Sequence, residues 1–131
     1  MSAENVRGFL AIAAAANRGD VDGVLRLTDP EIDLVPLRAP VQGSYSGHEG
    51  IRQFMADNEE TFETFEVDYP DVRDLGDQVL ALGTLRIRGK GSGAETEVPS
   101  TILCTFRDGL AVRFKDYGDR AQALEAAGLS E

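Results

Sequence analysis

The residue best suited to chemistry is Asp116, near the C-terminal end of the chain. Two alternating apolar runs flank the pair Asp108-Gly109, which is a strong signal for a β-hairpin with a tight turn. Since side chains alternate along a strand, one face of the second strand is predicted to carry Leu110, Val112, Phe114 and Asp116. A carboxylate that ends an apolar stripe suits acid/base catalysis, because burial raises its pKa toward neutrality.

Asp116 also has a structural interpretation, in which it pairs with an arginine or caps the final helix. Buried ion pairs perturb carboxylates as well, so the sequence leaves both interpretations open. Asp119 fits the structural role better, since it directly precedes the helical segment that starts at Arg120.

The predicted lining of the pocket is mainly apolar and includes Ile102, Val112 and Phe114. Tyr45, just before the longest helix, and Tyr69, on the face of Phe65 and Val67, are predicted to add polar groups. Each tyrosine could equally be a core aromatic residue with a satisfied hydroxyl.

The remaining reactive side chains favour structural roles. His48 is the single histidine and lies in a helix-start motif between glycines, which favours a solvated surface position over catalysis. Cys104 is the single cysteine, lies between apolar neighbours, and is predicted to be a small buried residue. One histidine and one cysteine do not form a metal site, and we predict no metal and no cofactor.

Helical spacing of apolar residues predicts three helices in the first half of the chain. The first follows Ser2 and ends near residues 17–19, and the second spans 21–27 after the capping residue Asp20. Pro30 ends that segment, and a strand is predicted over 32–37. A loop over 38–47 leads to the longest helix, which opens at Gly47-His48-Glu49-Gly50.

From Phe65 onward the apolar period changes to two, which predicts antiparallel strands. A turn is predicted at 74–77, a strand at 79–88, a hairpin loop at 89–94 and a further strand at 98–106. The more apolar face of the 79–88 strand is predicted to point inward. Arg86 and Arg88 then lie on the outer face, where they pair with Glu95 or Glu97 or contribute to a dimer interface.

Length and charge restrict the class of protein. The 131 residues, 42% of them hydrophobic, predict a single domain spanning residues 1–131 with a real core. The net charge of −10 argues against nucleic acid and anionic membranes as partners. The first apolar run is too short to span a bilayer, so a cytoplasmic protein is predicted.

Four segments in this order resemble the SnoaL-like branch of the NTF2-like superfamily: NRGDVDGVL, YSGHEGIRQF, RDGLAVRFKDY and QALEAAGL. The resemblance extends from Val6 to Leu129. It implies an α+β cone, in which a curved antiparallel sheet is closed by about three helices around an apolar cavity, plus a short C-terminal helix. It also implies frequent homodimers, and we expect a homodimer through the outer face of the sheet. It implies no particular reaction.

Three kinds of relative can be compared at single positions. Resemblance to ketosteroid isomerase would require polar groups near Ile12, Val35 or Leu37, and Ile102, and all of these are apolar. Limonene epoxide hydrolase places a catalytic aspartate at the position of Asp116, but its Arg-x-Asp partner is missing around Arg86 and Arg88. Polyketide cyclases of the family use one acid/base residue in an apolar cavity, a role that Asp116 matches.

Two functions follow from the sequence. The first is an acid/base enzyme of the cyclase, isomerase or hydrolase type that acts on a small apolar molecule through Asp116. The alternative is a non-catalytic ligand-binding or interaction module.

Overall fold

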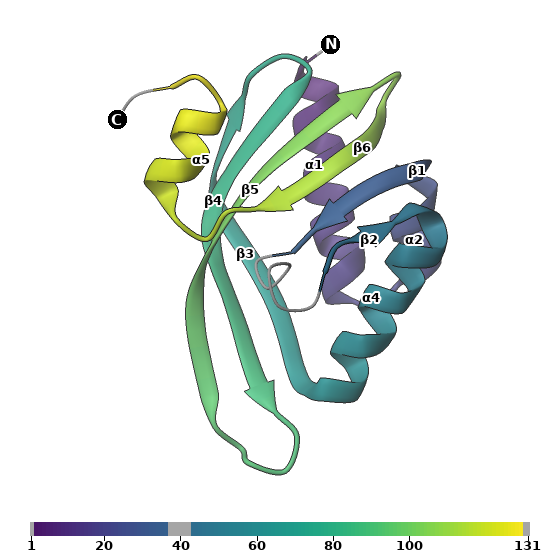
Figure 1. The fold of residues 1–131 in the computed structure, drawn as a ribbon, viewed down its shortest axis with the longest axis vertical. Coiled ribbons are helices and arrows are strands. Elements are labelled where there is room, and N and C mark those ends of the chain that lie inside the picture. Colours follow the sequence, from purple (N-terminus) through teal and green to yellow (C-terminus); the bar gives the residue numbers. More distant parts are fainter. Residues whose placement is uncertain (1, 37–42, 130–131) are drawn as a thin grey trace.

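The computed structural model describes residues 2–36 and 43–129 as an α+β fold in which helices pack on both faces of one curved sheet (Figure 1). In chain order its elements are α1 (Ser2–Asn17), α2 (Val21–Arg26), β1 (Thr28–Val35), β2 (Tyr45–Ser46), α4 (Gly47–Thr61), β3 (Phe62–Asp74), β4 (Gln78–Gly89), β5 (Glu95–Arg107), β6 (Leu110–Asp116) and α5 (Arg120–Ala126). The predicted fold class is therefore confirmed. No helix in the described part of the chain is long and apolar enough to cross a membrane.

The sheet has six strands in the order β2-β1-β6-β5-β4-β3. Strands β3 to β6 form the predicted antiparallel meander. The pairing of β1 with β6 is parallel, which the sequence did not predict, because β1 enters after a helix instead of through a hairpin. The prediction of an antiparallel sheet thus holds for all pairs but this one.

Local signals explain where the helices begin and end. The Asp20 carboxylate accepts a hydrogen bond from Gly23 N at 2.9 Å and so caps α2 as predicted. Thr28 closes that helix, since its hydroxyl donates to the carbonyl of Val24 at 3.1 Å. The first strand therefore starts at Thr28 and includes Pro30, four residues earlier than predicted. The part of the predicted 38–47 loop at 38–42 lies outside the described residues.

The turn at Asp108-Gly109 is confirmed. Both residues have positive φ, 55° and 82°, as a tight two-residue hairpin turn requires. The turn sets the register of β5 against β6, which brings Asp116 opposite Ile102. The closing helix is also confirmed, and Asp119 caps it by accepting from Ala121 N at 2.8 Å.

The two faces of the sheet are packed by different helices. The inner face, with Val79, Ala81 and Ile102, packs with α1 residues such as Phe9 in the main core. The outer face carries Leu80, Leu82 and Leu103, which are covered by Ala123 and Leu124 of α5. Figure 1 shows α5 and α1 on opposite sides of the strands. The predicted inward face of β4 is therefore confirmed.

The predicted alternation along β6 holds for Phe114 and Asp116 and is wrong for Leu110 and Val112. Thr105 pairs with Arg113 and Phe106 with Ala111, so Val112 is the extra residue of a β-bulge. The bulge shifts the alternation by one residue. Ala111, Phe114 and Asp116 share the inner face, whereas Leu110 and Val112 are not in the core that Phe114 joins.

Candidate functional site

The candidate site lies on the inner face of the sheet, where the strand register arranges side chains in rows. Asp116 of β6 is opposite Ile102 of β5, and the next inward residue of β5 is Ser100. Ser100 is opposite Gly83 of β4, and Gly83 lies against β3 at Tyr69. The order from the centre of the sheet outward is thus Asp116, Ser100, Tyr69.

The carboxylate of Asp116 is held by three hydrogen bonds. Its Oδ1 accepts from the backbone N–H of Gly118 at 2.9 Å and of Thr101 at 3.1 Å. Its Oδ2 accepts from the Ser100 hydroxyl at 3.0 Å. Neither structural interpretation of Asp116 applies as predicted, since Asp119 caps the helix and Asp116 has no arginine partner among residues 2–36 and 43–129.

Burial dominates the electrostatics of this carboxylate. Desolvation raises the pKa of Asp116 above its ordinary value, and the hydrogen bonds from Gly118, Thr101 and Ser100 offset part of that rise. The direction agrees with the sequence-based expectation for an acid/base residue. It results from low dielectric surroundings, since all three hydrogen-bond donors are uncharged.

A tyrosine extends the hydrogen-bonded group. The Tyr69 hydroxyl lies 2.8 Å from Ser100 Oγ, and Ser100 is only 1% exposed. Burial and the nearby Asp116 charge raise the pKa of Tyr69, so the phenol stays protonated. Tyr69, Ser100 and Asp116 therefore form one continuous chain of three oxygen-bearing side chains, which we call the polar row.

Aromatic rings pack beside the polar row. The Phe9 ring of α1 meets Tyr69 edge to face at a centroid distance of 5.2 Å and stacks on Phe114 at 5.7 Å. These contacts fix the Tyr69 ring and exclude water from one side of the row. Of the predicted site residues, Asp116, Tyr69, Phe114 and Ile102 thus come together in the structure.

A bulge in β3 positions Tyr69. Between Asp68 and Asp71 the register advances by one extra residue, so Tyr69 and Pro70 together oppose Gly83. Pro70 is tolerated because β3 is an edge strand and its missing N–H faces no partner. A Cβ on Gly83 would clash with the carbonyl oxygen of Asp68, so only glycine permits this close approach.

Two apolar rows continue the inner face beyond the polar row. Val67, Leu85 and Val98 pair across β3, β4 and β5, and the next row contains Phe65 and Ile87. All five side chains are partly exposed, unlike the buried core residues on the other side of Tyr69. The surface next to the polar row can therefore contact a small apolar molecule.

The other two predicted lining residues, Tyr45 and Val112, form no hydrogen bond or ring contact with the polar row in the described part of the chain. The Tyr45 hydroxyl donates to the Asp57 carboxylate of α4 at 2.9 Å, and its ring packs on Phe54 at 5.3 Å. Val112 is the bulge residue of β6 and lies outside the Phe9 core. Their roles in binding stay predictions.

The prediction that His48 occupies a solvated surface position is wrong. His48 is half-buried, and its Nε2 donates to the carbonyl of Thr28 at 2.9 Å, which ties α4 to β1. Cys104 is fully buried as predicted, and desolvation raises the pKa of its thiol. On the outer face Arg88 pairs with Glu95 at 3.3 Å as expected, whereas Arg86 pairs with Glu66 of β3 at 2.9 Å.

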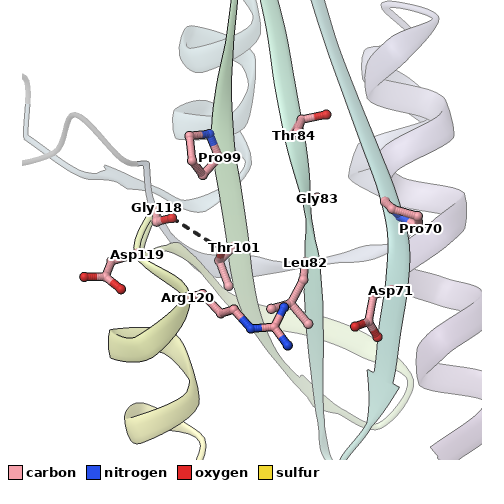
Figure 2. A pocket seen from close by; sticks show the side chains of 10 residues that line it. All are labelled: Pro70, Asp71, Leu82, Gly83, Thr84, Pro99, Thr101, Gly118, Asp119 and Arg120. Carbon is pink, nitrogen blue, oxygen red and sulfur yellow. Dashed lines mark hydrogen bonds between the residues drawn. The ribbon is translucent and has the colours of Figure 1, made fainter. Parts of the chain in front are cut away.

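A groove lies on the opposite face of the sheet, between β3 and the start of α5. Its volume is about 510 Å³, and it is lined by Pro70, Leu82, Gly83, Thr84 and Pro99, among others. Figure 2 shows Arg120 extending from α5 across Leu82 in the direction of Asp71. Thr101 and Gly118 line it too, so the groove backs directly onto the peptides that hold Asp116.

A second hollow, of about 550 Å³, lies where α1 ends beside α4 and β3. Its apolar lining includes Phe54, Met55, Phe62 and Phe65. Phe65 belongs to the second apolar row, with Ile87, so this hollow adjoins the two apolar rows of the inner face. Asp116 lines neither hollow.

Ser100 is the site residue that the sequence analysis missed. It interrupts an otherwise apolar inward series, Val98, Ile102 and Cys104, on β5. A single hydroxyl at an inward position of an apolar strand requires a buried partner, and that signal pointed to the site. Gly83 gave a similar signal, since a glycine inside a strand indicates a close backbone approach.

A family model described as a SnoaL-like domain matches residues 6–114. The chain belongs to this family. No curated protein matches the sequence of this SnoaL-like protein. The match agrees with the α+β fold and contains the motifs NRGDVDGVL and YSGHEGIRQF and the third motif as far as Phe114, whereas QALEAAGL lies beyond it.

Solved structures share the fold at low sequence identity. TerC, co-crystallised with polyporic acid, has a TM-score of 0.79 and 24% identity over 95% of this chain and 98% of its own. An NTF2-like protein from Burkholderia xenovorans LB400 has a TM-score of 0.75 and 25% identity over 97% of both chains. A protein with a ketosteroid isomerase-like fold from Catenulispora acidiphila, in complex with trimethylamine, has a TM-score of 0.76 and 22% identity over 94% of this chain and 93% of its own.

Proposed function

We propose that this SnoaL-like protein binds a small, mainly apolar molecule on the inner face of its sheet and transfers a proton with Asp116. The observation that carries the proposal is the Asp116 carboxylate, which is desolvated and accepts hydrogen bonds only from uncharged donors. Partly exposed apolar rows lie on the same face of the sheet, beyond Ser100 and Tyr69. Desolvation brings the pKa of a carboxyl group closer to neutral pH, where the group can both accept and donate protons.

The apolar rows supply the binding surface for such a molecule. Val67, Leu85 and Val98 lie directly beyond the polar row, so a ligand that covers them brings its polar end to Tyr69 and Ser100. The co-crystallisation of TerC with polyporic acid supports small-molecule binding in a protein of this fold. We therefore expect one ligand with an apolar body and an oxygen at one end.

A non-catalytic binding module is the second candidate. It is favoured by Asp116 Oδ1, which accepts from Thr101 and Gly118 and thereby shapes the connection from β6 to α5. A carboxylate retained only for that connection would need no proton transfer. Both functions use the same ligand surface, so they differ only in what Asp116 does.

Replacement of Asp116 by asparagine separates the two functions. The amide keeps an acceptor for the two N–H groups and removes the transferable proton, so turnover of small cyclic ketones, lactones or epoxides should fall about 100-fold or more. Asp119→Asn is the matched control, because it makes the same chemical change at a helix cap outside the site. Equal turnover by the wild type and Asp116→Asn would favour the binding module.

A further inference from the structure

We propose that the substrate exchanges its proton at the Tyr69 hydroxyl, and that Ser100 relays this proton to and from Asp116. The inference rests on the proposed function and names the group that contacts the substrate. Along the inner face, Tyr69 and Ser100 lie between Asp116 and the apolar rows. A ligand on those rows therefore reaches Tyr69 before it reaches the carboxylate.

The directions of the hydrogen bonds support this order. Ser100 has one hydroxyl proton, which it donates to Asp116 Oδ2 at 3.0 Å. The 2.8 Å contact between Tyr69 and Ser100 must then have Tyr69 as its donor. Every proton in the chain points toward the carboxylate, and the lone pairs of the Tyr69 oxygen remain available to a ligand.

The carboxylate itself is largely occupied by protein groups. Its Oδ1 accepts two backbone N–H groups and its Oδ2 accepts Ser100. Ser100 is 1% exposed and cannot serve a ligand directly. The Tyr69 hydroxyl and Asp116 Oδ2 each have one partner among the described residues, Ser100, and of these two oxygens Tyr69 is the one next to the apolar rows.

The relay balances as three coupled transfers. When protonated Asp116 gives up its proton, an O–H bond forms on Ser100, the Ser100 proton moves to Tyr69, and the Tyr69 proton moves to the substrate oxygen. The reverse sequence removes a proton from the substrate and stores it on Asp116. Transfer between oxygens is what hydroxyl groups support, so the substrate class is a carbonyl compound that enolises. Its oxygen takes the Tyr69 proton while solvent water removes the Cα proton, and in the reverse direction solvent returns a proton to Cα while the enol oxygen gives its proton back to Tyr69.

Deuterium incorporation into 2-tetralone in D₂O, followed by proton NMR, tests the relay. We expect the wild type to accelerate exchange, and Tyr69→Phe, Ser100→Ala and Asp116→Asn each to lose about 100-fold. Ser100→Thr keeps a hydroxyl and should restore the rate to within about threefold of wild type. The double variant Ser100→Ala/Asp116→Asn should be no slower than either single variant, because the three groups act as one unit.

The outcomes separate the relay from the proposed function. If Asp116→Asn loses activity while Ser100→Ala and Tyr69→Phe stay within about threefold of wild type, Asp116 acts directly and the relay is wrong. If Asp116→Asn keeps the wild-type rate, or the wild type does not accelerate exchange, the proton-transfer function fails and the relay fails with it. Near-ultraviolet circular dichroism of each variant confirms the native fold.

A measurement without substrate tests the coupling independently. In the wild type, the ring Cζ resonance of Tyr69 should follow the ionisation of Asp116, because Ser100 connects the two groups. In folded Ser100→Ala that dependence should become weaker, because only the through-space effect of the Asp116 charge on Tyr69 remains. A Tyr69 resonance that responds equally in both proteins would overturn the relay.

Discussion

At the scale of single residues, Asp116 combines two roles in one carboxylate. Oδ1 organises the backbone around Thr101 and Gly118, and Oδ2 faces the hydroxyl of Ser100. The two oxygens are therefore not equivalent. A substitution at this position changes the free energy of unfolding through the backbone contacts of Oδ1 and proton transfer through the Ser100 contact of Oδ2. Unfolding and turnover measurements therefore report on different oxygens.

The first prediction concerns the stability of Asp116 variants. Asp116→Ala should lower the free energy of unfolding by about 1–3 kcal/mol, since two backbone N–H groups lose their acceptor. Asp116→Asn should unfold close to wild type in urea at neutral pH. A loss for the asparagine variant as large as that for alanine would show that the negative charge itself stabilises the fold.

The pH dependence of stability follows from the raised pKa of Asp116. The folded protein holds this proton more tightly than the unfolded chain, so the contribution of Asp116 to stability falls as the pH rises through its folded pKa. The stability of the wild type relative to Asp116→Asn should therefore decrease from acidic to neutral pH. Urea unfolding of both proteins across that range measures it, and an opposite slope contradicts the burial argument.

At the scale of elements, the β3 bulge depends on one glycine of β4. In Gly83→Ala the new methyl group would meet the Asp68 carbonyl and Tyr69 Cα, so the bulge must move. We expect a loss of at least about 1–3 kcal/mol in unfolding free energy together with loss of ligand binding. Gly89→Ala on the same strand is the matched control, because its Cβ would meet only the Ser92 hydroxyl oxygen at 3.0 Å.

The C-terminal helix is a second element whose contribution can be isolated. Asp119→Ala removes the acceptor for Ala121 N and should cost about 1 kcal/mol in urea unfolding. Leu124→Ala should cost about 2–5 kcal/mol, because Leu124 is 1% exposed against the outer face of the sheet. If both changes cost nothing, α5 does not contribute to the stability of the folded domain.

At the scale of the whole molecule, the predicted homodimer through the outer sheet face can be tested. The α5 helix covers the apolar part of that face, and Thr84 lies in the uncovered groove beside Pro99. We expect light scattering to give a dimer for the wild type and a monomer for Thr84→Arg. A monomeric wild type at micromolar concentration would show that the dimer prediction is wrong.

The sequence predicted the architecture better than the site because the two depend on different information. Apolar period, the Asp108-Gly109 turn and the Asp119 cap are local signals, and each was confirmed. The bulges at Val112 and Tyr69-Pro70 depend on register between strands, which no local pattern specifies. Those bulges decide which side chains meet, so the sequence offered Asp116 as a candidate without the Ser100 hydroxyl that binds it.

The sheet that separates the outer groove from Asp116 is one peptide layer thick. Thr101 presents its N–H to the Asp116 carboxylate, while its hydroxyl donates to the carbonyl of Gly118 at 3.4 Å beside the groove (Figure 2). We therefore expect substitutions in the groove to shift the N–H groups of Thr101 and Gly118, which offset part of the rise in the pKa of Asp116. Substitutions on the outer surface are thus a way to adjust the pKa of Asp116 while every ligand-contacting side chain stays unchanged.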